Sequence, residues 1–158
     1  MGTYSTDKIT GGTASVDVVE AGDPTVNADK ACDNNGSTYW SSGSSALPHW
    51  WKYDFGAAVT WKIRKLTLSG RDAGNGLLAK NFVLASSPNN SDWTTVYTGL
   101  MANSTGVQTF TFGNANPYRY YRITFSDNYS GVYPNYTQIF EVEMMITIRE
   151  GGFLPFFL

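Results

Sequence analysis

The sequence predicts an all-β domain, a sandwich or jelly roll of about eight antiparallel strands. Short runs of β-branched and aromatic residues alternate with clusters of Gly, Ser, Asn, Asp and Thr along the chain, a pattern typical of strands joined by turns. No stretch keeps the apolar spacing of a helix for three turns. The length of 158 residues matches one ordinary domain.

The expected strands are short, and turn-forming residues lie between them. In chain order they are Ala14–Val19, Trp50–Phe55, Ile63–Leu68, Asn81–Ala85, Thr94–Tyr97, Gln108–Phe112, Tyr118–Phe125 and Gln138–Ile148. We assign residues 1–150 to this sandwich and residues 151–158 to an apolar C-terminal tail. The tail carries five large apolar side chains, so we expect it to be either a frayed end or a segment that docks and supports a homo-oligomer.

Alternation within two strands predicts which side chains form the core, because side chains two residues apart share one face of a strand. The expected core residues are Trp51, Tyr53, Phe55, Tyr121, Ile123 and Phe125. Between Ile63 and Leu66 the apolar parity changes, and one extra residue in the strand would produce that change. We therefore expect a twist or bulge at Arg64 and Lys65.

Composition restricts the classes of partner. The net charge of −2 gives no general attraction to phosphate backbones or anionic lipids, so nucleic acid is not expected as a partner. No segment approaches the ~20 apolar residues of a membrane span, and the N-terminus lacks a basic, apolar leader. We expect a soluble chain without membrane insertion, which can still be a piece of a longer secreted or virion protein. Cys32 is the single cysteine, so an internal disulfide is excluded, and we expect Cys32 to be a small buried apolar residue.

Six segments occur in an order that resembles the discoidin family, also called the coagulation factor C-type domain, and especially the family 32 carbohydrate-binding modules. They are Lys30–Trp40, Trp50–Gly56, Ile63–Leu68, Asn81–Ser86 with Trp93, Tyr118–Ile123 and Phe140–Glu143. The resemblance covers most of the chain, from about Ala28 to Met144. It implies a galactose-binding-like jelly-roll sandwich whose ligand-binding loops gather at one end.

The turn at 33–38 concentrates hard oxygen donors, which suit calcium. Taken alone, it is equally an Asx-type turn in which Asp33 and Asn35 bond their own backbone. The resemblance implies one structural Ca²⁺ held by this turn and a glutamate near the C-terminus. The ligands it implies are the side chains of Asp33, Thr38 and Glu141 and the carbonyls of Lys30, Asn35 and Phe140.

A second group of polar residues predicts a sugar site. Arg71 and Asn75 lie in a turn that resembles the sugar-contacting loop of family 32, and each can present two polar atoms to neighbouring hydroxyls. The alternative is a surface hairpin with a weak Arg–Asp ion pair. Tyr129 and Tyr133 are the expected stacking rings, in a polar loop with three tyrosines; alternatively, one or two of these rings cover the end of the sandwich.

We therefore interpret the chain as a non-catalytic module that binds glycans or cell-surface carbohydrate, in an extracellular, cell-surface or virion-associated setting. The alternative is an adhesion or virion-surface domain that binds a protein or membrane receptor. Ser41 follows Trp40 where many galactose-binding relatives have histidine, which weakens a prediction of galactose specificity. The only histidine, His49, has no nucleophile-elbow context, and a structural role is expected for it.

Overall fold

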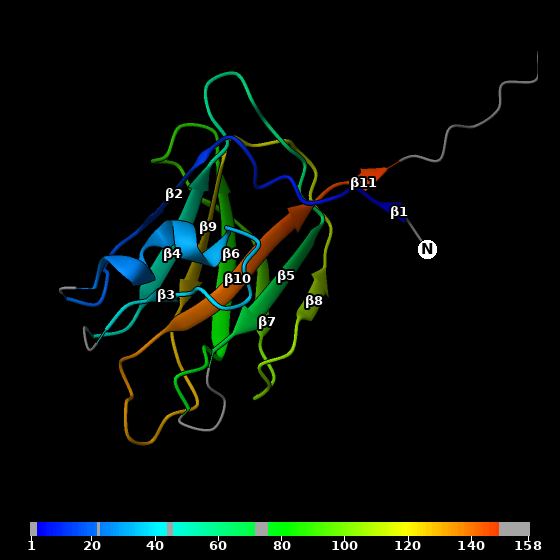
Figure 1. The fold of residues 1–158 in the computed structure, drawn as a ribbon. Helices are drawn as coiled ribbons and strands as arrows, with labels where there is room; N and C mark the ends of the chain where they lie inside the picture. Colours follow the sequence, from blue (N-terminus) through cyan, green and yellow to red (C-terminus); the bar gives the residue numbers. More distant parts are fainter. Residues whose placement is uncertain (1–2, 22, 44–45, 72–75, 149–158) are drawn as a thin grey trace, which may run out of the picture.

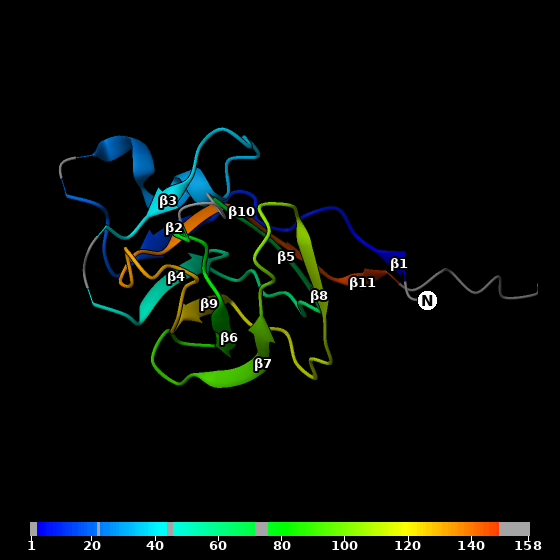
Figure 2. The ribbon, with the colours of Figure 1, turned by 90° about the horizontal axis from the view of Figure 1, so that it is seen from below.

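The computed structural model describes residues 3–21, 23–43, 46–71 and 76–148. These residues form a sandwich of two antiparallel sheets, which lie face to face in Figure 1 and are seen as two layers in Figure 2. The five-stranded sheet has the order β2-β4-β9-β6-β7, and the four-stranded sheet has the order β3-β10-β5-β8. The all-β sandwich predicted from the sequence is confirmed.

Eleven strands are present in the described part of the chain, instead of about eight. In the five-stranded sheet they are β2 (Thr13–Val16), β4 (His49–Asp54), β6 (Asn81–Ser87), β7 (Thr94–Leu100) and β9 (Tyr120–Phe125). In the four-stranded sheet they are β3 (Trp40–Ser41), β5 (Lys65–Gly70), β8 (Gln108–Thr111) and β10 (Gln138–Met145). The remaining two, β1 (Thr3–Tyr4) and β11 (Thr147–Ile148), pair with each other and extend to one side of the sandwich (Figure 1).

The difference in strand number comes from very short strands. β1, β3 and β11 have two residues each, too few to show an alternating pattern in the sequence. The run expected as one strand from Gln138 to Ile148 divides into β10 and β11. Two short 3-10 helices, Pro24–Val26 and Ala28–Ala31, precede β3. No helix in the described ranges has the length and apolar character needed to span a lipid bilayer.

The core lies between the two sheets. The six side chains expected there are all buried, each at 3% exposure or less. They alternate with outward residues along β4 and β9, so the period-two prediction is confirmed for both strands. From the other sheet, Leu66, Leu68, Val142 and Met144 pack against them.

The twist or bulge expected at Arg64 and Lys65 falls at the start of β5, where the N–H of Arg64 donates to the carbonyl of Met145, the residue that pairs with Lys65. β5 begins only at Lys65, and its register with β8 is regular from that residue onward. The apolar parity changes because Ile63 is buried in the segment before the strand, where Trp61 pairs with Tyr118. Register shifts also occur in β10, between Ile139 and Glu141, and along the pairing of β6 with β7.

Candidate functional site

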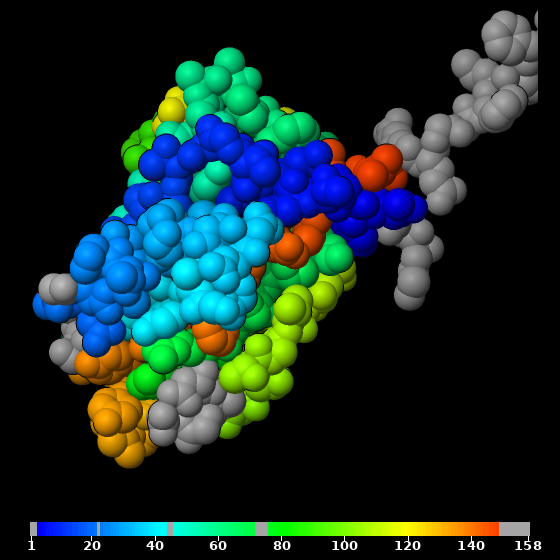
Figure 3. Space-filling model, in the orientation of Figure 1, coloured from blue at the N-terminus to red at the C-terminus, as the bar shows by residue number. Residues whose placement is uncertain are grey.

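Strand pairing brings distant segments together at one end of the sandwich. Gln138, the first residue of β10, pairs with Ser41 of β3, and the next residue pairs with the last residue of β5. The residues that follow β3, β5 and β9 therefore meet beside the start of β10. Figure 3 shows this end at the bottom of the molecule, where the orange loop after β9 lies next to green residues that precede β6.

A continuous chain of hydrogen bonds crosses this end. The Ser41 hydroxyl donates to Glu20 Oε2 (2.7 Å), and Gln138 Nε2 donates to the Ser41 hydroxyl (3.1 Å). Arg71 Nη1 donates to Gln138 Oε1 at 3.3 Å. Ser41 and Gln138 are buried, whereas Glu20 and Arg71 are half-exposed. The buried, uncharged side chains of Ser41 and Gln138 therefore hold the Glu20 carboxylate and the Arg71 guanidinium in fixed positions on the same surface.

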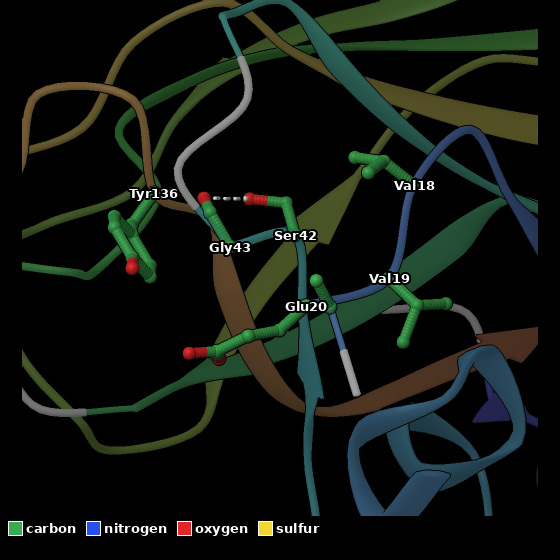
Figure 4. Close-up of a pocket in the computed structure, with 7 residues that line it drawn as sticks. Val18, Val19, Glu20, Ser42, Gly43 and Tyr136 are labelled. Atoms are coloured by element: carbon green, nitrogen blue, oxygen red, sulfur yellow. Dashed lines mark hydrogen bonds between the residues drawn. The ribbon is translucent and has the colours of Figure 1, made fainter. Parts of the chain in front are cut away.

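A pocket of about 320 Å³ lies beside Glu20 (Figure 4). Its walls are Val18, Val19, Glu20, Ala21, Ser42, Gly43 and Tyr136. Figure 4 shows the Glu20 side chain extending toward the side on which Tyr136 lies. Gly43 has a φ of +66°, and a Cβ there would come within 3.1 Å of the Glu20 Cα, so the wall needs glycine at this position.

A second pocket of about 360 Å³ adjoins the first, since Val19, Glu20 and Ala21 line both. Its other walls are Asp23, Pro24 and Asn27. Asp23 Oδ1 accepts hydrogen bonds from both the backbone N–H and the hydroxyl of Thr25. Those two bonds hold the pKa of Asp23 below its ordinary value. The two pockets meet at Val19, Glu20 and Ala21, and together they are called the Glu20 groove below.

The loop after β9 is held by buried polar groups. Asn128 is buried, and its Nδ2 donates to the carbonyls of Tyr133 (2.8 Å) and Tyr136 (2.7 Å). His49, exposed by only 1%, contacts Asp17 Oδ2 through Nδ1 and the carbonyl of Asn135 through Nε2, both at 3.0 Å. The structural role expected of His49 agrees with this position, because the ring joins the loop to the residue following β2.

The predicted sugar-binding residues occupy different environments at this end. The Arg71 guanidinium stacks on the ring of Tyr39, 3.9 Å from its centroid. Tyr133 is 47% exposed and contacts Tyr136 edge to face. Tyr129 instead packs on the core and donates its hydroxyl to the Met101 carbonyl (2.6 Å), which favours the alternative that it covers the end of the sandwich. Asn75 lies outside the described residues.

Sequence reasoning missed Glu20, Gln138 and the ring of Tyr136. Tyr136 belongs to the tyrosine-rich loop, so its loop was identified but not the ring that lines the pocket. Glu20 is an isolated acid in a turn, and Gln138 becomes relevant only through its register with Ser41. No local motif distinguishes either residue from other surface polar residues.

The oxygen-rich turn has the geometry of an Asx turn. Asp33 Oδ1 accepts hydrogen bonds from the N–H of Asn35 (3.1 Å) and the hydroxyl of Thr38 (2.7 Å). The Asn35 carbonyl accepts two more from Thr38, one from its N–H and one from its hydroxyl. The Lys30 ammonium lies 3.8 Å from Asp33 Oδ2. Three of the predicted calcium ligands, Asp33, Asn35 and Thr38, are therefore in contact with one another.

Glu141 and Phe140 lie on β10, where its register with β5 shifts and leaves Phe140 without a paired residue. Glu141 Oε2 is buried and has no hydrogen-bond partner among the described residues. Burial raises the pKa of Glu141 to about 7. The backbone hydrogen bond from Asn34 partly opposes this rise, and repulsion from Asp33 adds to it. A carboxylate oxygen that is buried, unpaired and close to the turn is suited to a cation.

No group of three or more His, Cys, Asp or Glu side chains in the described ranges is arranged to hold a metal ion. A calcium ion at the turn would therefore depend on carbonyl and hydroxyl oxygens in addition to two carboxylates, a donor set that Ca²⁺ accepts. Cys32 is half-buried beside the turn. Burial raises the pKa of its thiol to about 12, with further contributions from Glu141 and Asp29. The side chain packs against the core as a small apolar residue, but it is not fully buried.

The model of the F5/8 type C domain family matches residues 11–142 of this chain. The search of curated proteins found no match. Among solved structures, the family 32 carbohydrate-binding module of Clostridium perfringens NanJ in complex with galactose is 22% identical, with a TM-score of 0.75, covering 91% of this chain and 100% of the module.

Two further solved modules have the same fold. A family 32 module of Clostridium perfringens in complex with GalNAc-β-1,3-galactose is 16% identical, with a TM-score of 0.70, covering 84% of this chain and 94% of the module. A chitosan-binding module from a chitosanase/glucanase of Paenibacillus sp. IK-5 is 22% identical, with a TM-score of 0.71, covering 89% of this chain and 98% of the module. At these identities the similarity concerns the fold.

Proposed function

From the premise that this chain belongs to the F5/8 type C domain family, we propose that it is a carbohydrate-binding module. Its glycan site is the groove beside Glu20 together with the surface of Arg71. The ligands named for modules of the same fold, galactose, GalNAc-β-1,3-galactose and chitosan, support sugars as the ligand class. The proposed setting is extracellular, on a cell surface or on a virion.

One observation carries this proposal: a pocket of about 320 Å³ has Glu20 in its wall, and a chain of hydrogen bonds links Glu20 to Arg71. A carboxylate accepts hydrogen bonds from neighbouring sugar hydroxyls, and a guanidinium donates to them. The Tyr136 ring supplies an apolar surface for the C–H face of a pyranose. Since buried Ser41 and Gln138 fix the two charged groups, little ordering is left for the ligand to impose.

The groove is proposed to bind without catalysis. Glycoside hydrolysis uses two carboxyl groups, one of them an acid whose pKa is raised. The second carboxyl of the groove, Asp23, has a lowered pKa and is occupied by Thr25. Its position as a helix cap supports a structural role for Asp23, whereas Glu20 lines both pockets.

We also propose one structural Ca²⁺ at the turn 33–38. The support is the fit of the residues: Glu141 Oε2 is buried without a partner, and the side chain of Asp33 faces the same region. Bound there, the ion would neutralise both carboxylates and connect the turn to β10. Metal binding of this kind stabilises the folded state by mass action.

Adhesion to a protein or membrane receptor is the second candidate. The observation that favours it is the exposure of apolar side chains at the tip of the loop after β9, where Val132 is 76% and Tyr133 47% exposed. Exposed apolar groups at a loop tip suit contact with a partner surface. This candidate uses the same end of the sandwich, so binding assays must separate the two.

A glycan array in calcium and in chelator, followed by calorimetric titration with galactose and with the best-scoring glycan, tests the main proposal. Glu20→Gln and Arg71→Ala should each weaken binding at least tenfold, because hydrogen bonds to charged groups contribute ~1.5–3 kcal/mol. Asp92→Asn is the matched control, since it removes one negative charge from the exposed turn between β6 and β7 at the opposite end.

Equal binding by Glu20→Gln and Asp92→Asn would contradict the assigned groove. The Val132→Asp variant distinguishes the adhesion candidate from the carbohydrate proposal. If no glycan scores, and the parent chain binds lipid vesicles or cells in a manner that Val132→Asp abolishes, the adhesion candidate replaces the carbohydrate proposal.

A further inference from the structure

A third pocket, of about 250 Å³, lies at the opposite end of the sandwich. Its walls come from β6, β7 and the segment before β9: Ser86, Thr94, Thr95, Val96, Gly113, Asn114, Ala115, Asn116 and Tyr118. β9 starts at Tyr120, on this side, and ends at Phe125, before the loop that contributes Tyr136 to the Glu20 groove. The six residues of β9 separate the two ends by roughly 17 Å at the rise of an extended strand.

Ser86 has an unused hydroxyl at this pocket. The residue is fully buried, and its Oγ has no hydrogen-bond partner among the described residues. Ser86 pairs with Tyr121 of β9 and with Thr94 of β7, so its side chain is on the inward face of the sheet. A buried hydroxyl without a partner is costly unless something that enters the pocket supplies one.

The wall around this hydroxyl is held in place by other polar groups. Asn114 Nδ2 donates to the carbonyl of Ile63 (3.1 Å) and to the Tyr121 hydroxyl (2.9 Å), while its Oδ1 accepts from the N–H of Asn116. The Arg64 guanidinium donates to the Asn114 carbonyl. Asn114 therefore positions the segment that carries Asn116, and its own amide is already satisfied.

The pairing of β6 with β7 is irregular next to this pocket. Leu84 pairs with Tyr97 and Ala85 with Thr95, so Val96, which lines the pocket, has no paired residue on β6. A bulge of this kind bends the strand and redirects neighbouring side chains, and bulges are frequent next to binding sites. Thr94 and Thr95 follow the turn between the two strands at this point and belong to the wall.

We infer that this pocket is a second carbohydrate site, which takes a single neutral pyranose unit at the end of the molecule away from Glu20. The inference goes beyond the proposed function and uses none of its residues. The wall contains hydroxyls, amides and one half-exposed tyrosine ring, Tyr118, but no acidic or basic side chain. Hydroxyls and amides hydrogen-bond sugar hydroxyls, and a ring stacks on a sugar's C–H face.

The size of the pocket agrees with this ligand. A volume of about 250 Å³ corresponds to about eight water molecules and lies below the ~300–1,000 Å³ of pockets for drug-sized ligands, so it matches one sugar ring. Charged sugars are disfavoured, because no charged side chain of the wall would offset their desolvation. With one site at each end, a single domain could bridge two glycan chains, and binding to a glycan-coated surface would gain from multivalency.

The test is a titration of the ¹⁵N-labelled Glu20→Gln variant with galactose, glucose and N-acetylglucosamine, monitored by the amide signals of Thr95, Gly113 and Asn116. Concentrations should exceed a millimolar Kd by about tenfold. The Glu20→Gln substitution weakens binding at the first site, and the three amide signals report only on the pocket at the opposite end. Loss of binding at one site can therefore be told apart from loss of binding at the other. At least one of the three sugars should shift the three signals in a saturable way.

Two substitutions at one position and one at its neighbour complete the test. Ser86→Ala removes the unused hydroxyl and should not lower the melting temperature, while Ser86→Val also places methyl groups in the pocket. Both should weaken binding at this end at least fivefold. Ser87→Ala is the control, because the Ser87 hydroxyl is bonded to Asn89 and lies on the outward face. Absence of saturable shifts at this end, or equal binding by the Ser86 and Ser87 variants, would overturn the site.

Discussion

Replacing Glu141 by glutamine is expected to stabilise the protein without calcium and to remove most of the stabilisation that calcium gives. Glu141 Oε2 is buried and has no hydrogen-bond partner among the described residues, and burial raises the pKa of this carboxyl to about 7. Above that pH and without metal, the folded protein holds an ionised carboxylate with one oxygen unpaired. Glutamine removes the charge and keeps the shape.

The size of the effect follows from the shift in pKa. A rise from 4.5 to about 7 corresponds to ~3 kcal/mol at 1.36 kcal/mol per unit, and the partial exposure of Glu141 reduces it to ~1–3 kcal/mol. Because the folded-state pKa is the higher one, the folded protein binds more protons than the unfolded chain between these values. The stability contributed by Glu141 is therefore complete below pH ~4.5 and is lost as the pH rises through 7.

In chelator at pH 8, Glu141→Gln should raise the free energy of unfolding by ~1–3 kcal/mol, and at pH 4 it should have little effect. In calcium at 100 times its Kd, the parent chain should gain ~2.7 kcal/mol, whereas the variant, which lacks the charged ligand, should gain far less. Urea denaturation monitored by tryptophan fluorescence measures the effect of the substitution at pH 8 and at pH 4, and the calcium gain of the parent chain and of the variant.

Glu143→Gln is the matched control, because Glu143 lies on the same strand and its Oε2 accepts a hydrogen bond from Thr67 at 2.8 Å. Its stability should not respond to calcium differently from that of the parent chain. The reasoning is refuted if Glu141→Gln lowers stability in chelator at pH 8, or if calcium stabilises it as much as it stabilises the parent chain.

Four further outcomes are expected. Gly70→Ala should lower the free energy of unfolding by ~1–3 kcal/mol, because its Cβ would collide with the buried Leu78 side chain; an unchanged thermal melt contradicts this. Asn128→Ala should weaken glycan binding in calorimetry without touching the groove, since it removes the hydrogen bonds within the loop after β9; unchanged affinity contradicts it. Asp54→Asn should lower the free energy of unfolding by ~1 kcal/mol at pH 7 and by less at pH 2. Hydrogen bonds from Arg119 lower the pKa of Asp54 in the folded protein. The stabilisation from this pair is therefore present above pH ~4 and is lost as the pH falls through the folded-state pKa. Urea denaturation at both pH values checks this, and an equal loss at pH 2 contradicts it. A chain ending at Glu150 should sediment as a smaller species than the full chain if the apolar tail supports self-association; equal monomeric masses would exclude that role.

The fold was predictable because its core pattern is local. In β4, His49, Trp51 and Tyr53 alternate with half-exposed residues, and the period of two alone places them on one face. All eight expected strands occur, with ends that shift by a few residues. The strands that were missed, β1 and β3, exist only through pairing with distant segments, and two residues carry no period.

The site was predictable only in part, because its polar groups come together through register. Arg71 and the tyrosine-rich loop could be found from residue type and turn context. The contact between Ser41 and Gln138 joins positions 97 residues apart, and neither residue differs locally from any other polar residue at a strand end. Once that contact is known, Glu20 follows, since it accepts the Ser41 hydroxyl.

The buried polar residues explain how binding and stability can be separated in this domain. Those at the groove end whose side chains are hydrogen-bonded are Ser41, Ser42, His49, Asn128 and Gln138. Buried polar networks that are satisfied make a structure rigid and specify one arrangement, whereas leaving a member unpaired is costly. The groups that would face a sugar, Glu20, Arg71 and Tyr136, lie outside this buried layer and are partly exposed. Substituting them should therefore change affinity with little effect on folding, whereas substituting the layer beneath should affect both. That difference makes a loss of binding in Glu20→Gln interpretable as a loss of contact rather than a loss of structure.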